Sequence, residues 1–126
     1  MTSYVDTSAL LKAVVAEDYS EAFTDHVQDD LLLSSGVLVT ELHRAASRLD
    51  LAHSVIMDIL GWIDLVEVTP AVLMRAGLLP HPVLRSLDAI HVASALVGGA
   101  EEFITYDERQ ADAARAVGLR VVSPGI

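Results

Sequence analysis

Five short apolar runs recur along the chain, and a segment with helical periodicity separates each run from the next. The runs lie at residues 3–5, 31–33, 65–68, 103–105 and 119–122. An unbroken apolar run of this length is typical of a strand that is covered on both faces. Strands that alternate with helices favour a parallel sheet with helices on its faces. We therefore expect an α/β fold with a parallel five-stranded sheet flanked by helices.

The segments between these runs have the spacing and punctuation of helices. Their expected ranges are residues 10–15, 19–29, 37–49, 52–62, 70–77, 87–97 and 108–117. Pro70 favours a helix start, because its missing N–H is harmless at the first helical position. Gly98 and Gly118 each end a helix, and Asp107 is placed to cap the last one.

Length and composition bound the fold further. The chain has 126 residues, of which 52% are hydrophobic, so we expect one domain over residues 1–126. It has no cysteine, which excludes thiolate metal sites and disulfide scaffolds and favours the cytoplasm. No signal-like segment opens the chain, and no run approaches the ~18 apolar residues of a membrane span. We expect neither secretion by that route nor contact with a membrane.

The charge balance is strongly acidic, with 18 Asp and Glu against eight Lys and Arg and a net charge of −10. This excess argues against a basic groove that binds nucleic acid non-specifically, because such affinity comes mainly from neutralising phosphates. It does not argue against an enzyme that meets phosphates through bound cations, since clustered carboxylates hold such cations. The positions of the acids therefore matter most.

Four acids stand out: Asp6, Glu41, Asp88 and Asp107. Asp6 and Asp107 follow the first and fourth strands, and ligands of parallel α/β folds bind beyond the carboxyl ends of strands. Glu41 and Asp88 lie among apolar residues, where a carboxylate needs a compensating partner. Each acid also has a purely structural explanation, as a helix cap, a charge near a helix N-terminus or a solvated side chain.

If the four acids converge, their repulsion would raise their pKa values unless cations occupied the site. A carboxylate cluster without cysteine or a helical histidine pair suits hard cations such as Mg²⁺ or Mn²⁺. His91 can share a helical face with Asp88, and we expect it to pack or orient rather than catalyse. The other histidines lack ligand spacing, which disfavours zinc.

Four segments, in order, resemble the motifs of PIN-domain ribonucleases: YVDTSAL at 4–10, TEL at 40–42, SLDAIHVASAL at 86–96 and ITYD at 104–107. The most specific of them is LDAIHVA, at residues 87–93. The chain is most similar to the toxin branch of prokaryotic toxin–antitoxin pairs, the VapC type, over essentially its whole length.

The resemblance implies adjacent first and fourth strands and one or two divalent ions held by the four acids as catalytic and metal-binding residues. It implies hydrolysis of single-stranded or loop RNA and a cognate VapB-like antitoxin that blocks the site. We expect a homodimer or a toxin–antitoxin hetero-oligomer. Thr105 resembles the family's small hydroxyl residue before the fourth-strand Asp, and Asp112 is a candidate for a further acid of the site.

Two further groups of residues have expected places. Three apolar residues at helical positions are expected in the core: Met57, Trp62 and Met74. Three arginines are candidates for binding RNA beyond the site, although each also fits a solubilising surface role: Arg44, Arg48 and Arg85.

Other functions fit the sequence less well. A phosphatase of the haloacid-dehalogenase type needs a second Asp two residues after the first, where Ser8 stands. A response-regulator-like module needs a late lysine, and the only lysine is Lys12. A degenerate PIN-like module that only binds proteins is disfavoured by the four intact acids. We therefore expect a metal-dependent endoribonuclease that acts as the toxin of a toxin–antitoxin system.

Overall fold

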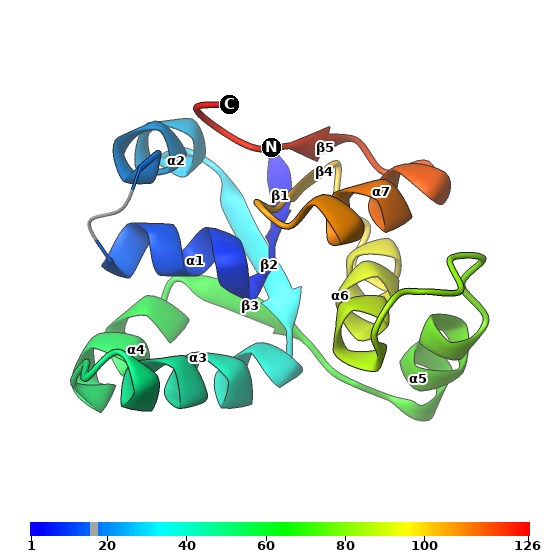
Figure 1. Ribbon diagram of the computed structural model, residues 1–126, viewed down its shortest axis with the longest axis horizontal. Coiled ribbons are helices and arrows are strands. Elements are labelled where there is room, and N and C mark those ends of the chain that lie inside the picture. Colours follow the sequence, from blue (N-terminus) through cyan, green and yellow to red (C-terminus); the bar gives the residue numbers. More distant parts are fainter. Residues whose placement is uncertain (16–17) are drawn as a thin grey trace.

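The computed structural model describes residues 1–15 and 18–126. Its centre is a sheet in which every strand pairs in parallel with its neighbours, in the order β3-β2-β1-β4-β5. The strands are β1 (Thr2–Val5), β2 (Leu31–Ser35), β3 (Ile63–Val66), β4 (Glu102–Ile104) and β5 (Val121–Val122). The expected parallel five-stranded sheet is confirmed, and β1 and β4 are adjacent (Figure 1).

Helices cover both faces of the sheet (Figure 1). They are α1 (Thr7–Val14), α2 (Ser20–Val27), α3 (Val37–Arg48), α4 (His53–Leu60), α5 (Pro70–Gly77), α6 (Ser86–Val97) and α7 (Glu108–Ala116). Among the residues described, no helix is long and apolar enough to cross a membrane.

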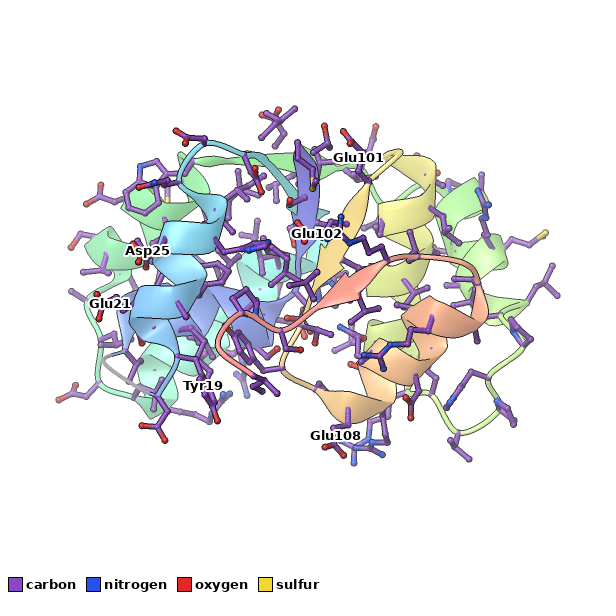
Figure 2. The ribbon with its side chains drawn as sticks, turned by 90° about the horizontal axis from the view of Figure 1, so that it is seen from above. Tyr19, Glu21, Asp25, Glu101, Glu102 and Glu108 are labelled. Atoms are coloured by element: carbon purple, nitrogen blue, oxygen red, sulfur yellow. The ribbon has the colours of Figure 1, made fainter. Side chains whose placement is uncertain are left out.

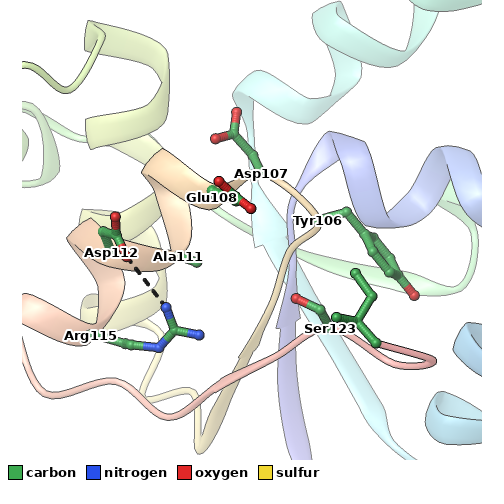
Figure 3. A pocket seen from close by; sticks show the side chains of 8 residues that line it. Tyr106, Asp107, Glu108, Ala111, Asp112, Arg115 and Ser123 are labelled. Carbon is green, nitrogen blue, oxygen red and sulfur yellow. Dashed lines mark hydrogen bonds and ion pairs between the residues drawn. The ribbon is translucent and has the colours of Figure 1, made fainter.

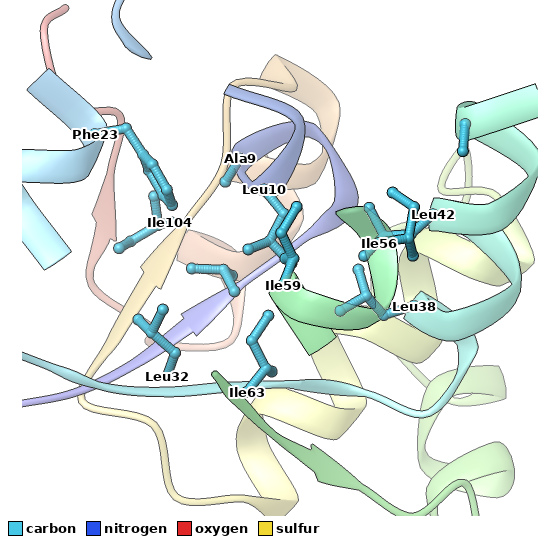
Figure 4. Packing of buried hydrophobic residues seen from close by; sticks show 12 residues of the cluster. Ala9, Leu10, Phe23, Leu32, Leu38, Leu42, Ile56, Ile59, Ile63 and Ile104 are labelled. Atoms are coloured by element: carbon cyan, nitrogen blue, oxygen red, sulfur yellow. The ribbon is translucent and has the colours of Figure 1, made fainter. Parts of the chain in front are cut away.

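The alternation of side chains along the strands divides the core into two layers. Val5 and Ile104 pack with α1 to α4 on one face of the sheet (Figure 4). Their neighbours Tyr4 and Phe103 pack with α6 and α7 on the other face. Successive strand residues point to opposite faces, so each apolar run contributes side chains to both layers of the core. Helix α5 packs against α6 in a smaller cluster through Val72 and Ala76.

Most expected elements form within two residues of their expected bounds, and α1 begins three residues earlier than expected, at Thr7. The third strand is shifted at both of its ends. It was expected at 65–68, but Ile63–Val66 pairs with β2, with Ile63 opposite Leu32. Ile63 is buried in the main core, so burial of this residue determines the register. Strand β5 pairs with β4 over two residues, with Val121 opposite Phe103 and Val122 opposite Ile104.

The expectation that three large apolar residues lie in the core is wrong. Met57, Trp62 and Met74 are 60%, 68% and 68% exposed. Helix α4 buries Ile56 and Ile59 instead. Both α4 and α5 are apolar around most of their circumference, so their periodicity does not distinguish the buried side from the exposed one.

Candidate active site

The topology brings the ends of β1 and β4 together. Val5 pairs with Ile104 at the carboxyl end of these parallel strands, and Asp6 and Asp107 follow within a few residues. In the sheet, β1 lies between β2 on one side and β4 on the other. This is the point at which the strand order reverses, where ligands bind in open parallel sheets.

A cavity of about 180 Å³ opens at this point. Its lining comes from the residues after β1 and β4 and from α3, α6 and α7: Asp6, Thr7, Ser8, Glu41, Asp88, His91, Asp107 and Gln110. All four acids that the sequence singled out therefore line one cavity. We call it the acid cavity.

Asp6 is the most buried of the four acids, with 3% of its surface exposed. Its Oδ1 accepts hydrogen bonds from the Ala9 N–H at 3.0 Å and the Ser8 hydroxyl at 2.7 Å, so it also caps α1. Its Oδ2 accepts from the Thr105 hydroxyl and from Nε2 of Gln110, the latter at 2.9 Å. Four donors thus replace the water that a buried carboxylate loses.

Thr105 links two of the acids. Its hydroxyl donates to Asp6 and accepts from the N–H of Asp107 at 3.1 Å. Oδ1 of Asp107 caps α7 by accepting from two backbone N–H groups, those of Arg109 and Gln110. Within the described part of the chain, Oδ2 of Asp107 has no hydrogen-bond partner. Asp6 and Asp107 are therefore helix caps and cavity residues at the same time.

A buried chain of hydrogen bonds orients Glu41. Its Oε1 accepts from the Thr7 hydroxyl at 2.9 Å and from Nε2 of His91 at 2.6 Å. Nδ1 of His91 lies 2.7 Å from the hydroxyl of Tyr4. Burial raises the pKa of Tyr4 far above its ordinary value, so this hydroxyl keeps its proton at neutral pH. Nε2 of His91 donates to Glu41, so the His91 ring bridges Tyr4 and Glu41.

The surroundings move the pKa values of Glu41 and Asp88 in opposite directions. Burial alone would raise the pKa of the Glu41 carboxyl, but the hydrogen bonds from His91 and Thr7 and the charge of His91 lower it below its ordinary value. The pKa of Asp88 is raised, first by burial and then by the negative charges of Asp107, Asp6 and Glu41, while His91 opposes this. The charges of all three other carboxylates therefore raise the pKa of Asp88.

Asp88→Asn should therefore stabilise the metal-free protein. A carboxyl whose pKa is raised by folding destabilises the folded state above that raised pKa and has no such effect below its ordinary pKa. We expect the melting temperature in EDTA to exceed that of the wild type at neutral pH and the difference to vanish as the pH falls. Asp112→Asn is the matched control, because Asp112 pairs with Arg115. An unchanged or lower melting temperature for Asp88→Asn at neutral pH would contradict the repulsion.

Asp112 lies outside the acid cavity. Its side chain is 68% exposed and 3.5 Å from Arg115, in a neighbouring cavity of about 360 Å³ (Figure 3). Glu108 lines the same neighbouring cavity. Asp112 is five residues after Asp107, and this spacing turns it away from the acid cavity. We leave Asp112 out of the proposed site.

Sequence reasoning missed Gln110, which is 2% exposed and donates to Asp6. Its partner is 104 residues away in the sequence, so no local motif contains the pair. One signal was available. Gln110 shares the buried face of α7 with Ala113 and Ala114, and a polar residue in an apolar stripe needs a partner.

A second polar cluster lies at the opposite end of the same strands. One ligand atom each from His26, Asp30 and Glu102 lies within 4.8 Å of the others. Glu102 begins β4, away from Glu108 (Figure 2). It is 1% exposed and lies 3.0 Å from Nε2 of His26, and Ser3 lies within hydrogen-bond distance of both acids. These contacts satisfy the buried carboxylate within the protein.

Comparisons with known proteins identify relatives of this chain. The sequence-family model of the PIN domain matches residues 3–116 of this chain. Ribonuclease VapC35 of Mycobacterium tuberculosis is 35% identical over 97% of this chain and 96% of its own length. Ribonuclease VapC46 of the same species is 36% identical over 96% of each chain.

Solved structures show the same fold. The sarcin–ricin loop cleaving toxin VapC20 of Mycobacterium tuberculosis has a TM-score of 0.76 at 16% identity, over 97% of this chain and 99% of that one. A chain of VapBC2 from Rickettsia felis, bound to a promoter DNA fragment, has a TM-score of 0.74 at 13% identity, over 98% and 99%. The sequence matches, the fold and the placement of the four acids lead to one assignment: the chain belongs to the PIN-domain family, in its VapC branch.

Proposed function

We propose that the protein is a metal-dependent endoribonuclease that hydrolyses RNA phosphodiester bonds with Mg²⁺ or Mn²⁺. The observation that carries this proposal is the convergence of four carboxylates in one cavity at the sheet's switch point. The donor set is made of oxygens, which hard cations prefer. The VapC relatives of this chain are named ribonucleases.

The residues divide the work of holding the ions. Asp6 would be the central ligand, Asp88 and Asp107 would be flanking ligands, and Glu41 would bind directly or through water. Divalent ions held there would supply an activated water and neutralise charge on the reacting phosphate. Thr105 and Gln110 fix the plane of the Asp6 carboxylate. His91 and Thr7 hold Glu41 in its charged form.

Cleavage in the presence and absence of metal tests this proposal. Purified protein freed of metal with EDTA should leave RNA intact, and adding Mg²⁺ or Mn²⁺ should restore cleavage. Mapping the cut sites on total cellular RNA then identifies the target. Undiminished cleavage in EDTA would exclude the metal-dependent mechanism.

Metal should also stabilise the folded protein. An ion that binds only the folded state stabilises it by about 2.7 kcal/mol at a concentration of 100 Kd, which is roughly 10 °C in melting temperature for a chain of this size. Differential scanning fluorimetry with Mn²⁺ measures this shift. Asp6→Asn should lose most of it, whereas a shift equal to that of the wild type would place the bound ion elsewhere.

We further propose that the chain, as one nuclease domain over residues 1–126, is the toxin of a cytoplasmic toxin–antitoxin pair. Similar folds occur in VapBC2 from Rickettsia felis, in VapBC-1 from nontypeable Haemophilus influenzae and in a toxin–antitoxin complex from Klebsiella pneumoniae. A VapB-like partner bearing an arginine would compete with the cations for the carboxylate oxygens, because guanidinium pairs with carboxylates in bidentate fashion.

This mode of inhibition has a direct test. Replacing the inserting arginine of the antitoxin by alanine should weaken inhibition more than removing an equal charge elsewhere, and added metal should partly oppose inhibition by the intact antitoxin. An antitoxin bound wholly away from the four acids would contradict it. Size-exclusion chromatography of the toxin alone and with its partner distinguishes a homodimer from a hetero-oligomer.

A further inference from the structure

A further cavity, different from the one beside Asp112, adjoins the acid cavity along α3. It measures about 390 Å³ and is lined by Thr7, Thr40, Glu41, Arg44, Arg48 and Leu87. Thr7 and Glu41 line both cavities, so the two are adjacent at these residues. A ligand held among the four acids can therefore extend into this second cavity, which we call the α3 groove.

The α3 groove carries two positive charges in a chain whose net charge is −10. Arg44 and Arg48 are about 6 Å apart along α3, roughly one helical turn, and so lie on one face. Neither forms an ion pair with any residue that the structure describes, although acids outnumber bases by 18 to eight. Glu41, the one acid in the lining, is bound to His91 and Thr7.

Both arginines are exposed, and neither has an ion-pair partner among the described residues. An external anion that reaches both would supply that partner. Phosphate fits this role, because the planar guanidinium group binds phosphate oxygens with two parallel hydrogen bonds. Leu87, which is 48% exposed, adds an apolar surface for a sugar or a base.

The cavity on the other side of the acid site has the opposite character. It shares Asp107 with the acid cavity and adds Glu108 and Asp112. Its one arginine, Arg115, is paired with Asp112 (Figure 3). Carboxylates repel the phosphates of a strand, so the two sides of the acid cavity offer unequal paths to RNA.

We infer that Arg44 and Arg48 form a phosphate-binding subsite for the RNA strand, which leaves the acid cavity along the α3 groove on one side of the scissile bond. This inference rests on the proposed ribonuclease function and specifies how its substrate is held. Arg85 is not among the residues that line the groove.

Salt-dependent binding tests the subsite without catalysis. The probe is a labelled single-stranded RNA, bound to the Asp6→Asn protein in EDTA and followed by fluorescence anisotropy. Adding Arg44→Ala and Arg48→Ala should weaken binding roughly tenfold and reduce the slope of log affinity against log salt by about 1.4, or about 0.7 per lost phosphate contact. The control pair Arg75→Ala and Arg120→Ala removes two exposed arginines elsewhere and should leave most of the slope.

Cleavage kinetics test the direction of the strand. In the active protein, Arg44→Ala with Arg48→Ala should raise KM while kcat stays within about twofold, because the arginines bind phosphates away from the reacting one. Substrates shortened from one end should lose affinity for the wild type, and those shortened from the other end should not. The double variant should lose this dependence.

Three results would overturn the subsite. They are a salt slope equal to that of the control pair, equal sensitivity to shortening from both ends, and loss of antitoxin affinity with RNA binding unchanged. The last would assign the groove to an acidic segment of the antitoxin. A wild type that cleaves no RNA with metal present would instead refute the proposed function, while the anisotropy measurement would still test the two arginines.

Discussion

Replacing Asp6 by Asn should lower the rate of RNA cleavage by roughly a thousandfold or more, because a central metal ligand contributes several kcal/mol to the reaction. Asn has nearly the shape of Asp but lacks the charge that a divalent ion requires. Single-turnover cleavage with saturating Mg²⁺ measures the effect. Asp112→Asn, which removes an exposed carboxylate in the neighbouring cavity, should cleave at the wild-type rate.

The fold should survive this substitution, because the donors around Asp6 can reverse. In the variant, the NH2 group of Asn replaces Oδ2 and faces Nε2 of Gln110, so two donors would meet. Gln110 can turn its own amide so that Oε1 accepts from this NH2 group instead. This oxygen is buried and has no hydrogen-bond partner in the described chain, so Oε1 gains a partner in the turn while Nε2 takes its buried, unpaired position. We expect a loss of about 1–2 kcal/mol in unfolding free energy. Retained cleavage with metal present would remove Asp6 from the centre of the mechanism.

His91→Phe should destabilise the protein by about 1–3 kcal/mol, because it removes the hydrogen bond between the His91 ring and the buried hydroxyl of Tyr4. Phenylalanine keeps the ring that packs edge-on against Tyr4. Urea unfolding measures the loss. Cleavage should fall as well, since Glu41 loses the hydrogen bond that orients it.

A double variant separates the two consequences. Adding Tyr4→Phe removes the stranded hydroxyl, so we expect Tyr4→Phe with His91→Phe to be at least as stable as His91→Phe alone. Cleavage should not recover, because Glu41 still lacks the hydrogen bond from His91. Additive losses of stability would show that Tyr4 and His91 do not act as one hydrogen-bonded unit.

The sequence pointed to the four acids for reasons that the structure makes physical. Asp6 directly follows the first apolar run and Asp107 follows the fourth, and the carboxyl ends of parallel strands share one edge of the sheet. Their capping role and their place in the cavity turned out to be compatible, because one carboxylate has two oxygens. Asp107 caps α7 with Oδ1 alone.

Other features depend on contacts that no local pattern contains. The partners of Gln110 and His91 are Asp6, Glu41 and Tyr4, at sequence separations of 50 residues or more. The register of β3 follows from the burial of Ile63 against the core. Hydrophobicity alone placed Trp62 inside, but only the packing of neighbouring elements determines which apolar residues stay exposed.

The central claim is that the four acids hold the divalent ions, and anomalous diffraction from crystals grown with Mn²⁺ tests it most directly. The account predicts a manganese peak in the acid cavity, about 2 Å from carboxylate oxygens of Asp6 and at least one of Asp88 and Asp107. Manganese found only at His26, Asp30 and Glu102, in crystals of protein that cleaves RNA in Mn²⁺, would contradict it.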